Sequence, residues 1–221
     1  MAALGSGGLC SLMEILYHDK DIVICVKPPR VLSTDEPGGL PDLVRQALNE
    51  TNIRTVHRLD RVVGGLVVLA KRSKAASELS RQIREGIFQK EYVALVHGCP
   101  QPQDGTFHDY IHRDPRERKS FLVPESSPQA QEAILHYTTE CSAGEYSRVR
   151  IRLITGRTHQ IRCQFSGHGY PLAGDRKYGI PDEAEDIALW SAKLSFLHPY
   201  SGKPMAFTLE PPKTYPWTDC K

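Results

Sequence analysis

Short apolar segments separated by turn-forming residues recur along the chain and predict more strands than helices. Residues 65–71 form a continuous apolar run that is typical of a buried strand, and residues 14–28 predict two short strands around a turn. Further strands are expected over residues 90–98, 133–139, 147–154, 189–197 and 205–209. Helices are expected over residues 40–49, 73–86 and 158–167. By contrast, residues 100–128 are rich in Pro, Asp and Ser and are expected to form a long surface loop.

The segment 147–154 alternates strictly between basic or polar and apolar side chains. Every second residue of a strand points to the same face, so three arginines are expected on one face. These are Arg148, Arg150 and Arg152. The pattern predicts a strand with one core face and one basic face.

Together these elements predict an α+β fold with a mixed, mainly antiparallel central sheet flanked by helices. No repeat or break in composition divides the chain, so residues 11–221 are expected to form a single domain. Residues 1–10 are rich in small residues and are expected to be a disordered tail.

The composition of the 221 residues is that of an ordinary globular protein, with 40% hydrophobic and 24% charged residues. No stretch approaches the roughly 18 apolar residues of a membrane helix, so no membrane association is expected. The six cysteines are scattered, without a CxxC pair. They are expected to be reduced thiols in a cytoplasmic protein.

The net charge of +2 hides two basic blocks. Residues 54–90 carry nine Lys or Arg against three acidic residues, and residues 141–178 carry seven against two. Basic blocks on an otherwise acidic chain indicate an anion-binding face, provided that the two blocks meet in space. Two separate solvated faces would give the same sequence pattern.

Several common chemistries lack their motifs. The chain has no Walker loop, no GxSxG elbow and no HExxH pair. His108 and His112 are four residues apart, but no glutamate intervenes and the segment lacks a helical pattern. We therefore predict no metal site.

Asp60, in the segment HRLD, is the first candidate for chemistry. It lies between a basic segment and an apolar strand, and Gly64 and Gly65 allow a sharp turn or a close approach. A carboxylate in such a place is a candidate nucleophile or general base. A structural ion pair explains the same pattern.

The segment TGRTHQIR is the second candidate. Arg157 is expected where a basic strand meets the start of a helix, a position that favours anions. His159, Gln160 and Arg162 add further donors. A capped helix with a solvated polar face is the alternative. Tyr92, on a predicted strand, fits either core packing or a stacking surface.

In combination these segments resemble the motifs of the RluA-type RNA pseudouridine synthases. HRLDRVVGGLVVLAK resembles the segment around the catalytic aspartate of that family. KEYVALVHG, LITGRTHQIRCQF, PLAGDRKYG and LWSAKLSFLHP follow in the family's order and spacing. The resemblance covers about residues 14–210.

The resemblance implies roles for individual residues. Asp60 matches the aspartate that attacks the target uridine. Tyr92 matches the tyrosine that stacks on the uracil and helps to remove the C5 proton. Arg157 matches the arginine that pairs with the catalytic carboxylate, and Arg58 matches the arginine that fills the space of the flipped base. Arg162 is expected to contribute to substrate binding.

The resemblance also implies an enzyme with a catalytic cleft that uses neither a metal nor a cofactor. Its partner is expected to be structured RNA, such as a tRNA or rRNA stem-loop. No separate S4-type RNA-binding module is expected, and a monomer is the default expectation. It departs from many members at Val63 and Gly64, where they have Thr and Ser.

Two alternatives stay open at this level. One is a catalytically inactive RNA-binding protein on the same scaffold. The other is a carboxylate-dependent hydrolase, which needs a second catalytic carboxylate, for which Asp175 is the best candidate.

Overall fold

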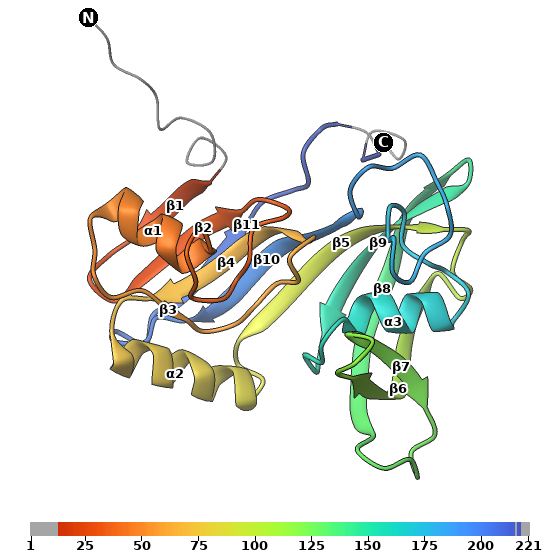
Figure 1. The fold of residues 1–221 in the computed structure, drawn as a ribbon, viewed down its shortest axis with the longest axis horizontal. Coiled ribbons are helices and arrows are strands. Elements are labelled where there is room, and N and C mark those ends of the chain that lie inside the picture. Colours follow the sequence, from red (N-terminus) through yellow and green to blue (C-terminus); the bar gives the residue numbers. More distant parts are fainter. Residues whose placement is uncertain (1–12, 215, 218–221) are drawn as a thin grey trace, which may run out of the picture.

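Eleven strands of the described residues join one mixed sheet, against which three helices pack (Figure 1). The structure is a computed structural model, and it describes residues 13–214, 216 and 217. The predicted tail at residues 1–10 lies outside these residues. The strands are β1 (Glu14–His18), β2 (Ile22–Lys27), β3 (Arg54–Thr55), β4 (Gly64–Ala70), β5 (Gln89–His97), β6 (Asp104–Asp114), β7 (Lys119–Val123), β8 (Gln131–Ala143), β9 (Tyr146–Leu153), β10 (Leu189–Leu197) and β11 (Pro204–Thr208).

The strand order in the sheet is β1-β2-β4-β10-β5-β9-β8-β6-β7, with β3 paired to β4 and β11 to β10. Strands β4 and β10 run parallel, and the other pairs formed by the described strands are antiparallel. The predicted α+β fold with a mixed, mainly antiparallel sheet is confirmed.

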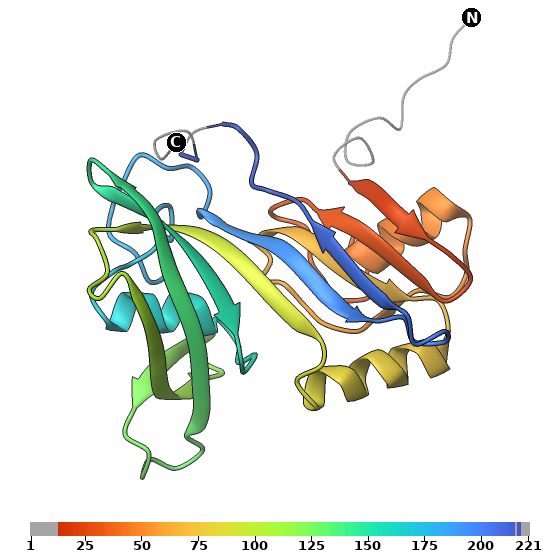
Figure 2. The ribbon, with the colours of Figure 1, turned by 180° about the vertical axis from the view of Figure 1, so that it is seen from behind.

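The helices cover both faces of the sheet. In Figures 1 and 2, α1 (Leu40–Leu48) lies beside the β1–β2–β4 half of the sheet, and α3 (Gln160–Gly167) lies on the same side over the β6–β9 half. Leu79 of α2 (Ser73–Arg84) packs against the opposite face, with Ile22 and Ile24. Covering both faces explains why β2 and β4 are buried along their whole length.

The prediction that residues 100–128 form a long surface loop is wrong. It contains the hairpin β6–β7, which continues the sheet beyond β8. Within β6, Phe107 and Ile111 are buried, and most of the residues around them are polar. Backbone pairing with β8 holds this strand in the sheet, so it does not need a continuous apolar face. Its few apolar side chains therefore give too weak a pattern to predict a strand from the sequence.

The cysteine prediction holds in part. Among the described residues, Cys25, Cys99 and Cys163 are free, as expected. Cys141 is disulfide-bonded, so the prediction that every cysteine is reduced is wrong. In the described part of the chain, no helix has the length and apolar character needed to cross a membrane.

Candidate active site

The two basic blocks of the sequence meet around one cleft of about 1700 Å³. The block 54–90 contributes four cationic residues to its lining: Arg58, Arg61, Arg84 and Lys90. The block 141–178 contributes five: Arg152, Arg157, Arg162, Arg176 and Lys177. The hypothesis of separate solvated faces is therefore excluded, because both blocks surround the same space.

The basic face expected on β9 is only partly in the cleft. Arg152 lines it, whereas Arg148 and Arg150 form ion pairs with Glu140 and Glu210. Those two arginines are neutralised within the protein. The hairpin β6–β7, which the sequence pattern did not reveal, supplies three further cationic residues: Arg113, Arg118 and Lys119.

Asp60 lines this cleft from the loop between β3 and β4, with 23% of its side chain exposed. The loop is held by hydrogen bonds to the segment after β2. The Ser33 hydroxyl donates to the carbonyl of Leu59 at 2.9 Å, and the Arg30 amide donates to the carbonyl of Arg61 at 2.7 Å. These bonds fix the backbone on both sides of Asp60.

Lys27 reinforces the same loop from inside the protein. Its side chain is fully buried, and its ammonium donates to the carbonyls of Pro28, Val31 and Arg61 at 2.7–3.1 Å. Burial lowers the pKa of Lys27 to about 7, an effect that the nearby Asp60 opposes. The lysine thus ties the Asp60 loop from beneath through hydrogen bonds to backbone carbonyls.

The side chain of Asp60 is held by Arg162 of α3. Nη1 of Arg162 donates to Oδ2 of Asp60 at 3.1 Å. The two other guanidinium nitrogens donate to both carboxylate oxygens of Asp175, at 2.8 and 2.7 Å. Arg162 therefore bridges two carboxylates, and Asp175 fixes the orientation in which it meets Asp60.

Asp175 itself is unsuited to acid–base chemistry. It is 2% exposed, and besides Arg162 it accepts hydrogen bonds from the amides of Lys177 and Tyr178. Although burial opposes the effect, the hydrogen bonds from Arg162 lower the pKa of Asp175. A general acid needs a proton to give, so this carboxylate does not support the hydrolase alternative.

The predicted ion pair between Arg157 and Asp60 is wrong. Arg157 is exposed, and its Nε donates to the carbonyl of Glu132 at 2.8 Å. The turn that carries Arg157 is tied by Gln160, which accepts from the Arg157 amide and donates to the carbonyl of Ile134. Arg157 stays on the rim of the cleft, whereas Arg162, one helical turn further on, points to Asp60.

Tyr92 and Arg58 occupy very different surroundings. Tyr92 lies on β5 and is 6% exposed, and burial together with the charge of Asp60 raises its pKa. The phenol of Tyr92 therefore stays protonated at neutral pH. The charge of Asp60 contributes to this effect, so the two side chains lie near each other. Arg58 is exposed and lines both the main cleft and a smaller adjoining hollow.

Gly64, where many family members have Ser, lies against the side chain of Trp190. Gly64 and Gly65 lie on β4 directly beside Trp190 and Ser191 of β10. A Cβ at position 64 would lie 2.6 Å from a ring carbon of Trp190. At Gly65, φ is +113°, and a Cβ would lie 2.4 Å from the Ser191 carbonyl oxygen. Trp190 thus fills the room that a serine at position 64 would need.

Two residues beside Asp60 had no separate role in the sequence prediction. His159 Nε2 lies 3.8 Å from Oδ2 of Asp60, and the ring of Tyr178 contacts both His159 and the guanidinium of Arg162. The sequence predicts His159 only as a further donor. Tyr178 falls in PLAGDRKYG, but only the fold brings that segment under α3.

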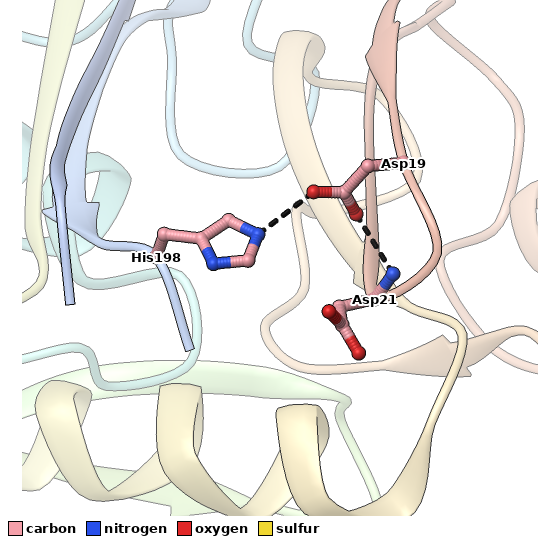
Figure 3. Close-up of side chains that lie close together, drawn as sticks. All are labelled: Asp19, Asp21 and His198. Atoms are coloured by element: carbon pink, nitrogen blue, oxygen red, sulfur yellow. Dashed lines mark hydrogen bonds and ion pairs between the residues drawn. The ribbon is translucent and has the colours of Figure 1, made fainter. Parts of the chain in front are cut away.

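Away from the cleft, Asp19, Asp21 and His198 place potential metal ligands within 4.8 Å of one another (Figure 3). His198 Nδ1 accepts the amides of Tyr200 and Ser201, so its hydrogen is on Nε2, which donates to Asp19 at 2.8 Å. A metal on Nε2 would have to displace that hydrogen. Hydrogen bonds account for the Asp19 and His198 side chains, whereas Oδ2 of Asp21 is buried without a hydrogen-bond partner among the described residues. The absence of a metal from the reaction stays a prediction.

Comparison with known proteins gives consistent matches. The family model described as RNA pseudouridylate synthase matches residues 21–167. The chain is 35% identical over 204 residues to the uncharacterized RNA pseudouridine synthase YjbO of Bacillus subtilis, covering 88% of this chain and 71% of that protein. It is 34% identical to the dual-specificity RNA pseudouridine synthase RluA of Escherichia coli, covering 88% of this chain and 91% of RluA.

The fold is similar to that of a solved human structure, RNA pseudouridylate synthase domain containing 1. The TM-score is 0.80 at 24% sequence identity, and the match covers 97% of this chain and 89% of the human one.

Proposed function

Because this chain belongs to the RluA-type family of RNA pseudouridine synthases, we propose that it isomerises specific uridines in tRNA or rRNA, with Asp60 as the nucleophile. The family makes it an isomerase that acts on RNA. The residues that carry the reaction and the class of RNA are our proposal. The same membership argues against an inactive RNA-binding protein.

The observation that carries the proposal is the asymmetric holding of the Asp60 carboxylate. Oδ2 accepts from Arg162, whereas Oδ1 has no hydrogen-bond partner among the described residues. Asp60 lines the cleft, so the carboxylate has one anchored and one unoccupied oxygen. That is the arrangement that a carboxylate nucleophile requires.

In the proposed reaction, the unoccupied oxygen of Asp60 attacks C1′ of the target uridine as the N1–C1′ bond breaks. The uracil rotates, C5 bonds to C1′, and the bond between C1′ and the carboxylate is released. C5 then loses its proton and N1 gains one, so that product and substrate are isomers. No electrons are transferred, and the chemistry therefore needs no redox cofactor.

Arg162 supports this sequence by orienting the carboxylate and placing a positive charge beside it. Although burial opposes the effect, hydrogen bonds to Asp175 and Asp60 raise the pKa of Arg162, so the guanidinium is permanently charged. Tyr92 is proposed to give the uracil an aromatic surface. Its raised pKa argues against a phenolate that takes the C5 proton.

Phosphates of the RNA are proposed to bind the cations around the cleft. Arg58, Arg118 and Arg157 are exposed there, and no ion pair joins them to an acidic group of the described residues. Their contacts would offset the few kcal/mol that a base requires to leave its stack. Arg58 is proposed to occupy the space of the extruded base.

The test is pseudouridine mapping of total RNA from cells with and without this gene. Sites that disappear on deletion and return when the wild-type gene is restored would support the proposal and name the RNA. Mapping should cover tRNA and rRNA together, because the relative RluA is named for dual specificity. An unchanged map would overturn the proposal.

A further inference from the structure

Tyr178 links the hairpin β6–β7 to His159 through its phenolic oxygen. The backbone amide of Ser120 donates to that oxygen at 2.7 Å, and the Ser120 side chain contacts it as well. Nδ1 of His159 lies 2.8 Å from the same oxygen. A phenol that accepts from the Ser120 amide and donates its own hydrogen to Nδ1 satisfies both side chains.

This arrangement favours one tautomer of His159. With Nδ1 accepting the phenolic hydrogen, a neutral imidazole carries its hydrogen on Nε2. Nε2 lies 3.8 Å from Oδ2 of Asp60, the same oxygen that Arg162 contacts at 3.1 Å. Arg162 thus donates a hydrogen bond to Oδ2, and Nε2 of His159 faces the same oxygen from beyond hydrogen-bond distance. Oδ1 has no partner among the described residues.

The backbone at His159 is held in an unusual conformation that maintains this direction. His159 has a φ of +56° and forms the N-cap of α3, a left-handed conformation that few non-glycine residues adopt. The Ser120 hydroxyl donates to the carbonyl of Thr158 at 2.7 Å. Ser120 therefore anchors both Tyr178 and the residue before His159.

The charges around His159 favour its neutral form. Burial lowers its pKa, and so do Arg162, Arg113 and Lys177, whereas Asp60 opposes them. Among the residues that the structure describes, these four groups and Tyr178 are the titratable or charged side chains that act on the ring from the neighbouring elements.

We propose that His159 is a positioning residue for Asp60, whose Nε2 hydrogen, directed by Tyr178, holds Oδ2 so that Oδ1 faces the substrate. The proposal rests on the proposed role of Asp60 as nucleophile. It adds a second donor to the site and gives the hairpin β6–β7 a part in aligning the carboxylate, through Ser120.

Two substitutions of His159 separate the donor from the rest of the side chain. His159→Asn tolerates the left-handed backbone and can still contact Tyr178, but its amide is too short to replace Nε2. His159→Gln places an amide N–H near the Nε2 position. His18→Asn, at an exposed histidine on β1, is the matched control.

The first measurement is the single-turnover rate of pseudouridine formation at saturating enzyme, with total RNA from cells that lack the gene. His159→Asn should lower the rate by about tenfold, because the carboxylate loses an N–H group that faces Oδ2 and that a small movement brings into hydrogen-bond distance. RNA affinity and melting temperature should not change, and His159→Gln should recover most of the rate. An unchanged rate in His159→Asn, an equal loss in both variants, or a loss confined to RNA affinity would each overturn the proposal.

The second measurement needs no RNA. Heteronuclear NMR of the histidine ring nitrogens should show the His159 hydrogen on Nε2, and Tyr178→Phe should abolish that preference. A hydrogen on Nδ1 in the wild type would overturn the proposal. Wild-type protein without activity on any RNA would instead defeat the proposed function, and this positioning role with it.

Discussion

The guanidinium of Arg162 donates to Oδ2 of Asp60 at 3.1 Å, although the two residues lie 102 positions apart in the chain. Only the fold brings the loop after β3 against α3. The contact decides which arginine supports the candidate nucleophile, and it separates the expected effects of substituting Arg162 and Arg157.

Arg162→Met should destabilise the protein by about 3–5 kcal/mol, because it leaves the buried Asp175 without its ion-pair partner. Arg162 has 7% of its side chain exposed, and Asp175 has none. Denaturant unfolding followed by circular dichroism measures the loss. Arg157→Ala is the control and should cost less than about 1 kcal/mol, because Arg157 is exposed and contacts a carbonyl. Equal losses in the two variants would contradict this assignment.

Gly64→Ser should destabilise the protein by about 1–3 kcal/mol, because the new Cβ meets the ring of Trp190. Trp190→Ala removes that ring, so Gly64→Ser should destabilise the Trp190→Ala variant less than it destabilises the wild type. A double-mutant cycle of unfolding free energies should therefore give a coupling of about 1 kcal/mol or more. Part of the cost should persist, because Pro29 also lies 3.2 Å from the added Cβ. Additive losses would show that Trp190 does not restrict position 64.

Lys27 should make folding more favourable as the pH rises from about 7 to about 10. Its pKa is lowered from 10.5 to about 7, so across this window the unfolded chain binds a proton that the folded chain has released. Below about pH 7 both states are protonated, and the penalty for the buried charge is fully present. Each pH unit in the window contributes up to about 1.4 kcal/mol.

The measurement is the free energy of unfolding against pH for wild type and Lys27→Met. The difference between the two proteins should shift in favour of wild type as the pH rises, because other titrating groups cancel in the comparison. A difference independent of pH would mean that Lys27 keeps an ordinary pKa.

Arg118→Ala and Arg113→Ala should each weaken RNA binding without changing the unfolding free energy by more than about 0.5 kcal/mol. Both side chains are exposed on the hairpin β6–β7 and line the cleft. Each loss should reduce the slope of log affinity against log salt concentration by about one. Arg148→Ala, which removes an arginine already paired with Glu140 and Glu210, should leave that slope unchanged.

The sequence predicted the strands whose apolar residues are continuous or alternate, because periodicity records burial directly. It also offered Asp60 as a candidate for chemistry, but it left open whether the two basic blocks meet, which the fold decides. It did not predict the hairpin β6–β7, because Phe107 and Ile111 are the two buried apolar residues of a long and otherwise mostly polar β6.

The wrong choice between Arg157 and Arg162 has a different cause. Both arginines occur within GRTHQIR, and spacing alone cannot tell which one faces a loop about a hundred residues earlier. The left-handed backbone at His159 sets the direction in which α3 begins. The buried Asp175 then orients the side chain of Arg162. Such long-range contacts leave no local pattern in the sequence.

The most direct test of the central claim is Asp60→Asn. The amide has nearly the same shape as the carboxylate but is a far weaker nucleophile, so the variant should fold and bind RNA as the wild type does. Its pseudouridine formation should fall below detection in a single-turnover assay on RNA from cells lacking the gene. If Asp60→Asn formed pseudouridine at the wild-type rate, Asp60 would not be the nucleophile and the proposed mechanism would be wrong.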